Sequence, residues 1–423
     1  MLLQFSVKNY KTFKDKATLS LIASNYDKGT REDDNVIVNE KFGLRILKSA
    51  VVYGANASGK SKLFDALSSM RYFAIFSSKI QKGEVVPVQP FRLSSETENE
   101  PSEFEVIFIF NDVMYRYGFE ATEHKVISEW LYFKPEKKEI ELFYRDGDNY
   151  ETHKKHFSKG GNVAEQGLVR DNALLLSVAA NFNEKEANSV ISWFYDNHRN
   201  ISGLKETGYQ DFTMRQVEDI EQKTKILSLL KAADLGIRNI GLQKLDVVNK
   251  ENHDEKVKFV NVLTMHKKYD SNKKTVENVT FSLFDDESSG TEKFFFLTGP
   301  ILNVLENGYT LIVDELDSKL HPNLVNKLVS LFNSKEFNPK NAQLIFNTHD
   351  TNLLNTGLFR RDQVWFTEKN RYGEAKLYSL ADFKSIRKTD LLEDNYINGK
   401  YGAIPFLGYF DDLNNLPHYE DKK

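Results

Sequence analysis

The octapeptide GANASGKS at residues 54–61 restricts the fold of this chain more than any other feature. It follows a short apolar run, 47–53, and precedes a segment, 60–76, whose Leu63, Leu67 and Met70 recur at helical spacing. The pattern Gly-x4-Gly-Lys-Ser is typical of a loop that joins a buried strand directly to a helix. The sequence therefore predicts a strand–loop–helix unit, the building block of α/β folds with a parallel sheet.

The physics of this loop indicates a phosphate cradle. Gly54 and Gly59 let the backbone bend so that its N–H groups point at phosphate oxygens, and the helix N-terminus adds positive partial charge. Lys60 would reach the β- and γ-phosphates, and the Ser61 hydroxyl would ligate Mg²⁺. We therefore expect ATP and Mg²⁺ as cofactors, held also by the loop residues Asn56 and Ser58.

A second apolar strand, 311–313, ends in two carboxylates, Asp314 and Glu315. Asp314 would hold Mg²⁺ directly or through water. Glu315 would act as the general base that polarises the attacking water. An acidic surface turn is the alternative interpretation, but the loop at 54–61 favours a shared site.

Two weaker signals complete the candidate site. His349 follows the buried strand 343–347, where it could contact the γ-phosphate or serve a structural purpose. The run 287–291, ESSGT, precedes a helical segment and contains Ser288 and Gly290. Such a turn is either a second anion site or an ordinary helix N-cap.

Periodicity predicts one α/β unit made of four parts. Residues 1–84 form an N-terminal core with the phosphate loop, and residues 85–160 alternate apolar and polar side chains as an antiparallel β lobe. Residues 165–250 show helical spacing and predict an inserted helical lobe. Residues 255–423 return to short strands alternating with helices, which predicts that the parallel sheet is completed there.

Two local predictions concern shorter segments. The polar stretch 24–39 predicts a loop. The run 352–356 predicts the beginning of a helix.

Composition excludes several classes of protein. The 423 residues contain no cysteine, so disulfides, zinc–thiolate sites and thiol catalysis are excluded. With 57 basic and 61 acidic residues, the net charge of −4 gives no global attraction to nucleic acid or an anionic membrane. The N-terminus lacks a long apolar signal region, and no run approaches the ~18 apolar residues of a membrane span. We expect a cytoplasmic protein without membrane contact.

These motifs, in this order, resemble the ABC-type ATPase heads of the SMC, RecF and OLD families. FSVKNYKTF at 5–13 is similar to their opening strand, ESSGT to their signature loop, and DELDSKLHP at 314–322 to their Walker B and D-loop. His321 departs from the pattern, because many family members have Asp there. Among these families the chain is most similar to stand-alone bacterial ATP-binding proteins like RloA and the AbiL ATPase. They share runs like RRDQVWFTEK at 360–369 and the segment 399–405.

The resemblance implies an ATP-dependent homo-oligomer, at least a head-to-head dimer. Ser288 and Gly290 of one head would cap the ATP bound by the partner head, His349 would be the switch histidine, and Gln89 would contact ATP and Mg²⁺ as a Q-loop residue. No coiled coil or Toprim nuclease is evident in the sequence. The resemblance therefore implies a separate, nuclease-like effector under the control of this ATPase in defence against phage.

A DNA-clamping ATPase like RecF is the alternative function. It would need a basic surface near the dimer cleft. The basic residues near the phosphate loop and N-terminus that could contribute are Lys8, Lys11, Lys14, Lys62 and Arg71. They could equally form a solvated face, so nucleic acid remains an open partner.

Overall fold

The computed structural model describes residues 1–25, 28–203, 208–248, 256–384, 386 and 390–405. At its centre lies a six-stranded sheet in the order β11-β15-β16-β5-β17-β18, in which all neighbours are parallel except β17 and β18. Its strands are β5 (Ser49–Gly54), β11 (His198–Ser202), β15 (Thr310–Asp314), β16 (Gln343–Asn347), β17 (Val364–Lys369) and β18 (Ala375–Ser379). The carboxyl ends of β5, β15 and β16 therefore meet at one edge.

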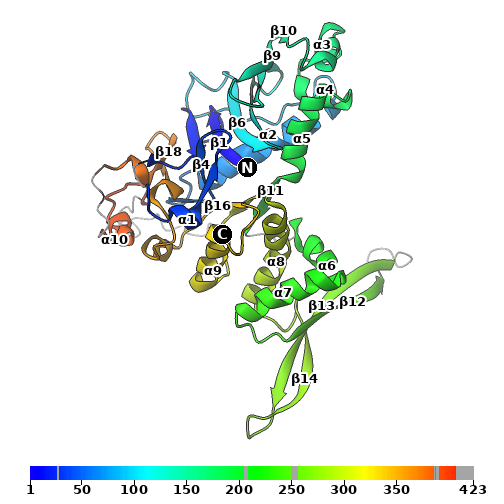
Figure 1. Cartoon of the computed structure of the whole chain (residues 1–423), viewed down its shortest axis with the longest axis vertical. Helices are drawn as coiled ribbons and strands as arrows, with labels where there is room; N and C mark the ends of the chain where they lie inside the picture. Colours follow the sequence, from blue (N-terminus) through cyan, green and yellow to red (C-terminus); the bar gives the residue numbers. More distant parts are fainter. Residues whose placement is uncertain (26–27, 204–207, 249–255, 385, 387–389, 406–423) are drawn as a thin grey trace, which may run out of the picture.

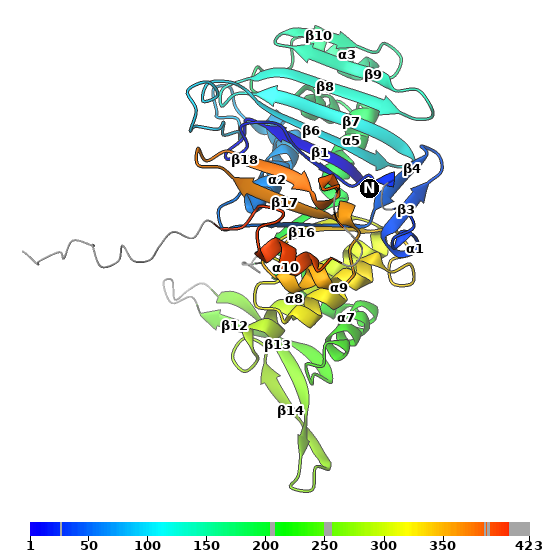
Figure 2. The ribbon, with the colours of Figure 1, turned by 90° about the vertical axis from the view of Figure 1, so that its left-hand side faces the viewer.

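The parallel sheet is buried on both faces, which explains its uninterrupted apolar strands. Alternate residues of β5 divide between two cores: Val52 joins the core shared with the antiparallel sheet, and Val51 joins the core under helices α8 (Ser289–Asn307) and α9 (Pro322–Asn333). Ile312 and Val313 of β15 divide in the same way. The sheet is thus the middle layer of the molecule (Figure 2).

A seven-stranded antiparallel sheet, in the order β10-β9-β8-β7-β6-β1-β2, lies at one end of the molecule (Figure 1). Its strands are β1 (Leu2–Lys8), β2 (Ala17–Ser20), β6 (Ser102–Phe110), β7 (Val113–Ala121), β8 (Val126–Lys134), β9 (Ile140–Asp146) and β10 (Asn149–Thr152). Helices α2 (Lys60–Phe76), α4 (Leu175–Asn181) and α5 (Lys185–Asp196) share its apolar core. There the rings of Phe108 and Trp193 stack 3.9 Å apart.

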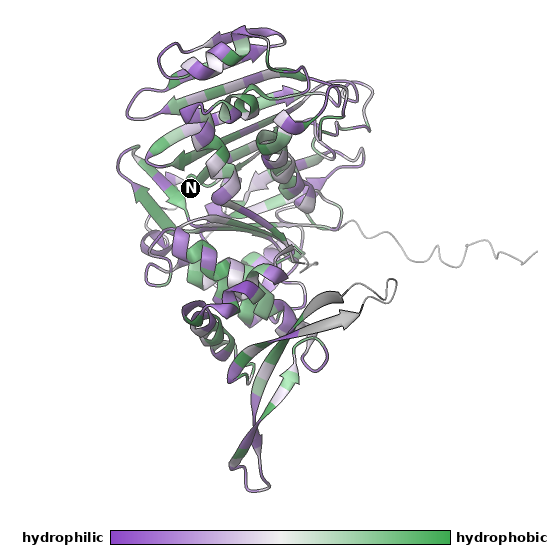
Figure 3. Cartoon of the chain, turned by 90° about the vertical axis from the view of Figure 1, so that its right-hand side faces the viewer, coloured by the Kyte–Doolittle hydropathy of each residue, from purple (hydrophilic) through white to green (hydrophobic). Residues whose placement is uncertain are grey.

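The opposite end is a three-stranded arm of β12 (Asn239–Val248), β13 (Lys256–Tyr269) and β14 (Thr275–Ser282). Helices α6 (Gln210–Glu218) and α7 (Ile220–Ala232) share an apolar core with α8 at its base. Figure 3 shows the arm tapering to a hydrophilic tip. The remaining elements are α1 (Glu32–Asn35), α3 (Ser158–Glu165), α10 (Leu392–Ile397), β3 (Val36–Asn39) and β4 (Leu44–Leu47).

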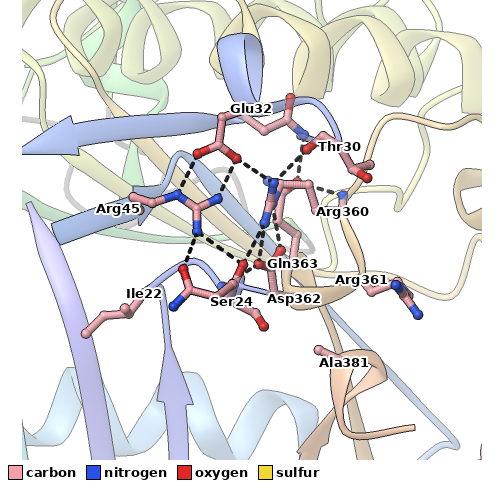
Figure 4. A network of polar contacts seen from close by, with 12 residues as sticks. Ile22, Ser24, Thr30, Glu32, Arg45, Arg360, Arg361, Asp362, Gln363 and Ala381 are labelled. Atoms are coloured by element: carbon pink, nitrogen blue, oxygen red, sulfur yellow. Dashed lines mark hydrogen bonds and ion pairs between the residues drawn. The ribbon is translucent and has the colours of Figure 1, made fainter. Parts of the chain in front are cut away.

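The run that begins at Arg360 forms a buried polar network (Figure 4). The fully buried guanidinium of Arg360 forms ion pairs with Glu32 at 3.0 Å and Asp362 at 2.9 Å. Glu32 also pairs with Arg45, and this bond lowers the pKa of the Glu32 carboxyl. Gln363 accepts a hydrogen bond from Asn35 at 2.6 Å. This part of the motif therefore fastens the N-terminal segment to the beginning of β17.

The α/β class, the parallel core sheet and the antiparallel β lobe predicted from sequence are confirmed. The loop prediction for 24–39 is wrong, because α1 and β3 form there and β3 pairs with β4. The run 352–356 belongs largely to a 3₁₀ turn, Thr351–Asn355, and not to an α-helix.

The sequence predicts one helical lobe over residues 165–250, but the structure divides this segment between separate parts of the fold. Its helices α4 and α5 cover the antiparallel sheet, whereas α6 and α7 lie beside α8. The segment also contributes β11 to the parallel sheet and β12 to the arm. Helical periodicity identified buried faces here but could not say which sheet each would cover. Residues 249–250 of this segment and 406–423 of the C-terminal core lie outside the described residues.

No helix among the described residues has both the length and the apolar character that crossing a bilayer would require.

Candidate active site

The loop between β5 and α2 adopts a shape that requires both of its glycines. Gly54 has φ +153° and Gly59 has φ +118°. A Cβ on Gly54 would lie 2.4 Å from the carbonyl oxygen of Thr367, and one on Gly59 would lie 3.3 Å from the Thr12 hydroxyl. Side chains at these positions would fill the space beneath the loop and strain its backbone. The two glycines therefore shape the loop by their φ values and by the close approach of their neighbours.

Lys60 begins α2 and bends back over the loop. Its ammonium donates to the carbonyl oxygens of Gly54 at 2.7 Å and Ala55 at 3.1 Å. Burial lowers the pKa of Lys60, and the carboxylates of Glu315 and Asp314 oppose that shift. Its positive charge is thus held beside the backbone N–H groups of the loop, where an anion would be stabilised by both.

Asp314 and Glu315 stand at the carboxyl end of β15, beside the end of β16. The side chain of Asn347 donates to Asp314 and accepts a hydrogen bond from the backbone N–H of Glu315 at 2.6 Å. Glu315 has φ +58°, a conformation that non-glycine residues adopt rarely. One asparagine from the neighbouring strand therefore fixes both carboxylate-bearing residues.

His349 lies across the same space. Its backbone N–H donates to Asp317 at 3.2 Å, which joins the turn after β16 to the turn after Glu315. The exposed imidazole, Glu315, Lys60 and Ser61 all line one pocket of about 570 Å³. Ser58 and Asn56 line it too. The structure thus brings together most of the residues predicted for catalysis and phosphate contact.

Ser288 and Gly290 are not among the residues lining this pocket. Ser288 caps α8, accepting a hydrogen bond from the backbone N–H of Thr291 at 3.1 Å. A Cβ on Gly290 would lie 2.7 Å from the carbonyl oxygen of Lys319. The fully buried Lys293, one turn further along α8, donates to the carbonyl oxygens of Glu315 and Leu316 at 3.3 and 3.2 Å. Helix α8 is therefore fastened to the backbone that carries Glu315.

Gln89 also lies outside the pocket lining. Its side chain is exposed, and its carbonyl oxygen accepts a hydrogen bond from the backbone N–H of Lys11 at 2.8 Å. The structure thus brings the backbone of Gln89 to Lys11, next to Thr12, but does not place Gln89 among the residues that line the pocket with Ser61. His321, the departure from the family pattern, caps α9 by accepting from the backbone N–H of Asn323 at 3.2 Å.

Sequence reasoning missed two residues that line the pocket. Thr12 lies in the turn between β1 and β2, and its buried hydroxyl has no hydrogen-bond partner among the described residues. Lys369 ends β17 and lines the pocket as well. Thr12 lies within the run FSVKNYKTF, and Lys369 ends the run RRDQVWFTEK. Both runs are evident in the sequence, but neither indicates that these residues line a pocket.

A second pocket of about 790 Å³ adjoins the first and extends towards α10. Tyr396 of α10 donates to the carbonyl oxygen of Ala403 at 3.1 Å, and its ring lies 5.7 Å from the ring of Tyr53, the residue before the phosphate loop. Glu393 accepts hydrogen bonds from Thr351 at 2.7 Å and Asn355 at 2.9 Å. The C-terminal helix therefore contacts both the strand that leads into the phosphate loop and the turn after His349.

Comparison with known families gives this site a context. The family model described as "AAA domain, putative AbiEii toxin, Type IV TA system" matches residues 49–355. That span begins with β5 and includes the loop, both carboxylates and His349. The chain belongs to this AAA domain family. It is therefore an AAA-type P-loop ATPase by family.

Solved structures similar to this AAA domain include SMC heads and a transporter ATPase. The SMC head domain from Thermotoga maritima is 13% identical, with 89% of this chain and 98% of that chain covered and a TM-score of 0.41. An SMC head bound to the C-terminal winged-helix domain of ScpA is 15% identical, with 89% and 97% covered and a TM-score of 0.44. CbiO1 from Clostridium perfringens, part of an ABC transporter complex, is 11% identical, with 90% of each chain covered and a TM-score of 0.31.

All three TM-scores are low, so the fold assignment rests on the strand order described above. No curated protein matches the chain.

The residues of this AAA domain fit a magnesium–nucleotide. A side chain at Gly54 or Gly59 would crowd the loop that forms the cradle, and Thr12, whose buried hydroxyl has no hydrogen-bond partner among the described residues, lines the same pocket. No group of three or more acidic or histidine side chains that could hold a metal gathers among the described residues. Mg²⁺ in phosphate-loop enzymes needs few protein ligands, because phosphate oxygens and water supply the rest. Ser61, which lines the pocket, and Asp314, which precedes Glu315 but is not among the lining residues, are the residues that would hold it.

Proposed function

We propose that this protein hydrolyses ATP to ADP and phosphate. The observation that carries the proposal is the single pocket in which Lys60 and its loop face Glu315 and His349. A phosphate cradle alone would suit any phosphate ligand. A carboxylate that lines the same pocket adds the base that hydrolysis requires.

Each residue has a defined part in this reaction. The loop N–H groups and Lys60 hold the β- and γ-phosphates, and the charge of Lys60 stabilises the negative charge that develops as the terminal phosphoryl group leaves. Glu315 accepts the proton of a water whose oxygen forms the new bond to the γ-phosphorus. The bond from that phosphorus to the bridging oxygen breaks, and ADP departs with the bridging electrons. Ser61 and Asp314 would hold Mg²⁺, which would neutralise phosphate charge. His349, which lines the same pocket, would contact the γ-phosphate.

The active unit in this proposal is a dimer of heads. Ser288 and Gly290 lie outside the pocket of their own chain, so their proposed role is to cap the ATP of a partner chain. A helix N-terminus such as that of α8 suits a γ-phosphate because its N–H groups and dipole favour negative charge. Lys293 would link this cap to the backbone of Glu315 in the same chain.

Mixing two inactive variants tests hydrolysis and dimerisation together. Lys60→Ala removes the cradle of one chain, and Ser288→Arg blocks the cap of the other, so each homodimer is inactive. A heterodimer of the two variants keeps one intact site, formed by the cradle of the Ser288→Arg chain and the cap of the Lys60→Ala chain. A heterodimer of a wild-type chain with a chain that carries both changes loses both sites. Phosphate release should therefore recover to roughly a quarter of the wild-type rate in an equal mixture. No recovery would contradict the composite site, and activity of a Ser288→Arg homodimer would also contradict it.

The proposed biological role is control of a separate effector in defence against phage. Support comes from the resemblance to RloA- and AbiL-like ATPases and from the family description, which names a toxin of a toxin–antitoxin system. Co-purification of the tagged chain with the product of a neighbouring gene, compared between Glu315→Gln and Lys60→Ala, tests this role. A partner retained only by the ATP-trapped variant would support it. Equal recovery of the partner with both variants would contradict the proposal that nucleotide controls its binding.

The DNA clamp near the phosphate loop receives less support. Lys11 is paired with Asp65, and Lys14 forms ion pairs with Glu96 and Glu374 at 3.3 Å each. Arg71 donates to the carbonyl oxygen of Phe194 at 2.7 Å. Three of the five basic side chains named for that surface are thus engaged within the chain.

A further inference from the structure

The outer half of the arm is a two-stranded ribbon. Pairing between β12 and β13 stops at Met265, whereas pairing between β13 and β14 continues to Tyr269. From His266 to Asn278 the chain is therefore a hairpin that projects away from the body, as Figures 1 and 2 both show. Nothing in the hydrophobic cores includes a residue beyond Met265 on this ribbon.

The ribbon is basic although the whole chain is acidic. It contains four lysines, Lys267, Lys268, Lys273 and Lys274, against two carboxylates. Both carboxylates are engaged: Glu277 pairs with Lys268, and Asp270 accepts backbone hydrogen bonds from the turn. Across the parts of the chain that the structure describes, no carboxylate pairs with the other three lysines, and all of them are exposed.

We propose that this ribbon, residues 266–278, binds duplex DNA. The inference goes beyond ATP hydrolysis and effector control, and it concerns a surface far from the five basic residues considered above. Three exposed, unpaired ammonium groups on a slender projection suit the regularly spaced phosphates of a nucleic acid backbone. The exposed Tyr269 adds an amphipathic ring beside them.

The shape of the ribbon selects DNA over RNA. Strands in a sheet lie about 4.8 Å apart, and the major groove of B-DNA, about 12 Å wide, admits a two-stranded ribbon. The major groove of A-form RNA is deep and narrow and excludes one. A duplex RNA of the same sequence is therefore the discriminating competitor.

The base of the ribbon touches the signature turn. Glu287, the first residue of ESSGT, accepts hydrogen bonds from Thr264 at 2.6 Å and shares one with His266 at 2.7 Å, both on β13. Its neighbour Ser288 caps α8, and Lys293 of α8 holds the backbone of Glu315. A displacement of the ribbon would thus reach the backbone of Glu315 through hydrogen-bonded contacts. Resting on the proposed ATPase function, the same inference holds that DNA on the ribbon alters ATP turnover through Glu287.

Binding is tested without nucleotide, so the result does not depend on the proposed ATPase. Fluorescence anisotropy of a labelled 30-bp duplex is measured with the full chain over a series of salt concentrations. The triple variant K267A/K273A/K274A should bind at least tenfold more weakly at low salt and lose about three units of the salt slope. The matched control K137A/K138A/K155A removes three exposed lysines from the opposite end of the molecule and should bind like wild type.

Three outcomes would overturn the proposal: no binding by wild type at low salt, equal losses in both triple variants, and equal affinity for duplex RNA. The link through Glu287 has its own readout. Duplex DNA should change the wild-type ATP turnover, and Glu287→Gln should bind DNA equally but show no such change. A change of the same size in Glu287→Gln would remove Glu287 from the link. Absence of any basal turnover would count against the proposed ATPase and leave the binding result standing.

Discussion

Glu129 in the antiparallel sheet and Lys60 at the edge of the parallel sheet are both buried charged groups, but they differ in their hydrogen-bond partners. Glu129 accepts hydrogen bonds from Tyr117 at 3.1 Å and from the backbone N–H groups of Leu175 and Leu176 at 2.6 and 3.0 Å. The Arg145 guanidinium lies 4.0 Å away. Among the residues that the structure describes, Lys60 donates only to the carbonyl oxygens of its own loop.

The difference distinguishes a structural charge from one held for a ligand. Glu129 joins β8 to the N-terminus of α4, and every contact it makes belongs to the fold. Lys60 forms no bond to a carboxylate within the described part of the chain, although Glu315 lines the same pocket. Its charge is therefore left to an anion that enters the pocket. Substitutions at the two sites should accordingly separate stability from function.

The largest effect is expected at Glu315. Glu315→Gln keeps the shape of the side chain but removes the base, so ATP turnover should fall by about 10²- to 10⁴-fold. ATP affinity, measured by calorimetry, should change little because the cradle is intact. The exposed Glu336 provides a control, since Glu336→Gln should keep wild-type turnover. Turnover that survives Glu315→Gln would assign the base to another residue.

Glu129→Ala should be the most destabilising change. It removes the acceptor of three hydrogen bonds and leaves the buried Arg145 guanidinium without its nearby carboxylate. This should lower the free energy of unfolding by about 3–5 kcal/mol. Denaturant unfolding measures the loss, and ATP affinity of the folded fraction should be unchanged. Glu136→Ala, at an exposed turn of the same sheet, should shift the unfolding free energy by no more than about 0.5 kcal/mol. A loss at Glu129 equal to that at Glu136 would deny the structural role.

The contrast between these two groups also shows what sequence can predict. The sequence predicts the phosphate loop because its chemistry lies within eight consecutive residues, and it predicts Glu315 because this residue follows an apolar strand. Thr12 and Lys369 come from β1–β2 and β17, and only the meeting of two sheets places them in the pocket. Glu129 carried no signal either, because Arg145 and the N-terminus of α4 meet it only in the folded chain.

The same reason explains the segments that differed from expectation. Residues 165–250 had correct helical spacing, but spacing shows that a face is buried and not which core buries it. The polar stretch 24–39 contains a short strand because β4 supplies a partner for it and Arg360 supplies a counter-charge for Glu32. Both partners lie outside the segment, so composition alone favoured a loop.

Lys60→Ala should weaken ATP binding and leave stability almost unchanged, which is the opposite of Glu129→Ala. Loss of charge-assisted contacts to phosphate, about 1.5–3 kcal/mol each, should weaken ATP binding by about 100-fold. Stability should hardly change, because removing a buried ammonium also removes the cost of its desolvation. Calorimetry and denaturant unfolding measure the two quantities. Lys82→Ala, at an exposed position outside the pocket, is the control. Unchanged affinity in Lys60→Ala would refute the assignment of the cradle.

The smallest effect is a pH dependence that belongs to Glu129. Burial raises the pKa of Glu129 from 4.5 to about 6, against the opposing influence of Arg145. Between these values the native state binds more protons than the unfolded state, so its stability should fall as pH rises from about 4.5 to about 6 and stay level above. The shift corresponds to about 2 kcal/mol.

Glu129→Gln isolates this contribution, because glutamine resembles the protonated acid and does not titrate. Unfolding free energies of the two proteins are compared at intervals from pH 4.5 to 7. The wild type should lose about 2 kcal/mol relative to Glu129→Gln over that range, whatever the other carboxylates contribute to both. A difference that is constant with pH would mean that Glu129 titrates alike in the folded and unfolded chains. A difference that grows in favour of the wild type would mean that Arg145 outweighs burial, and Glu129 would then be a stabilising ion pair.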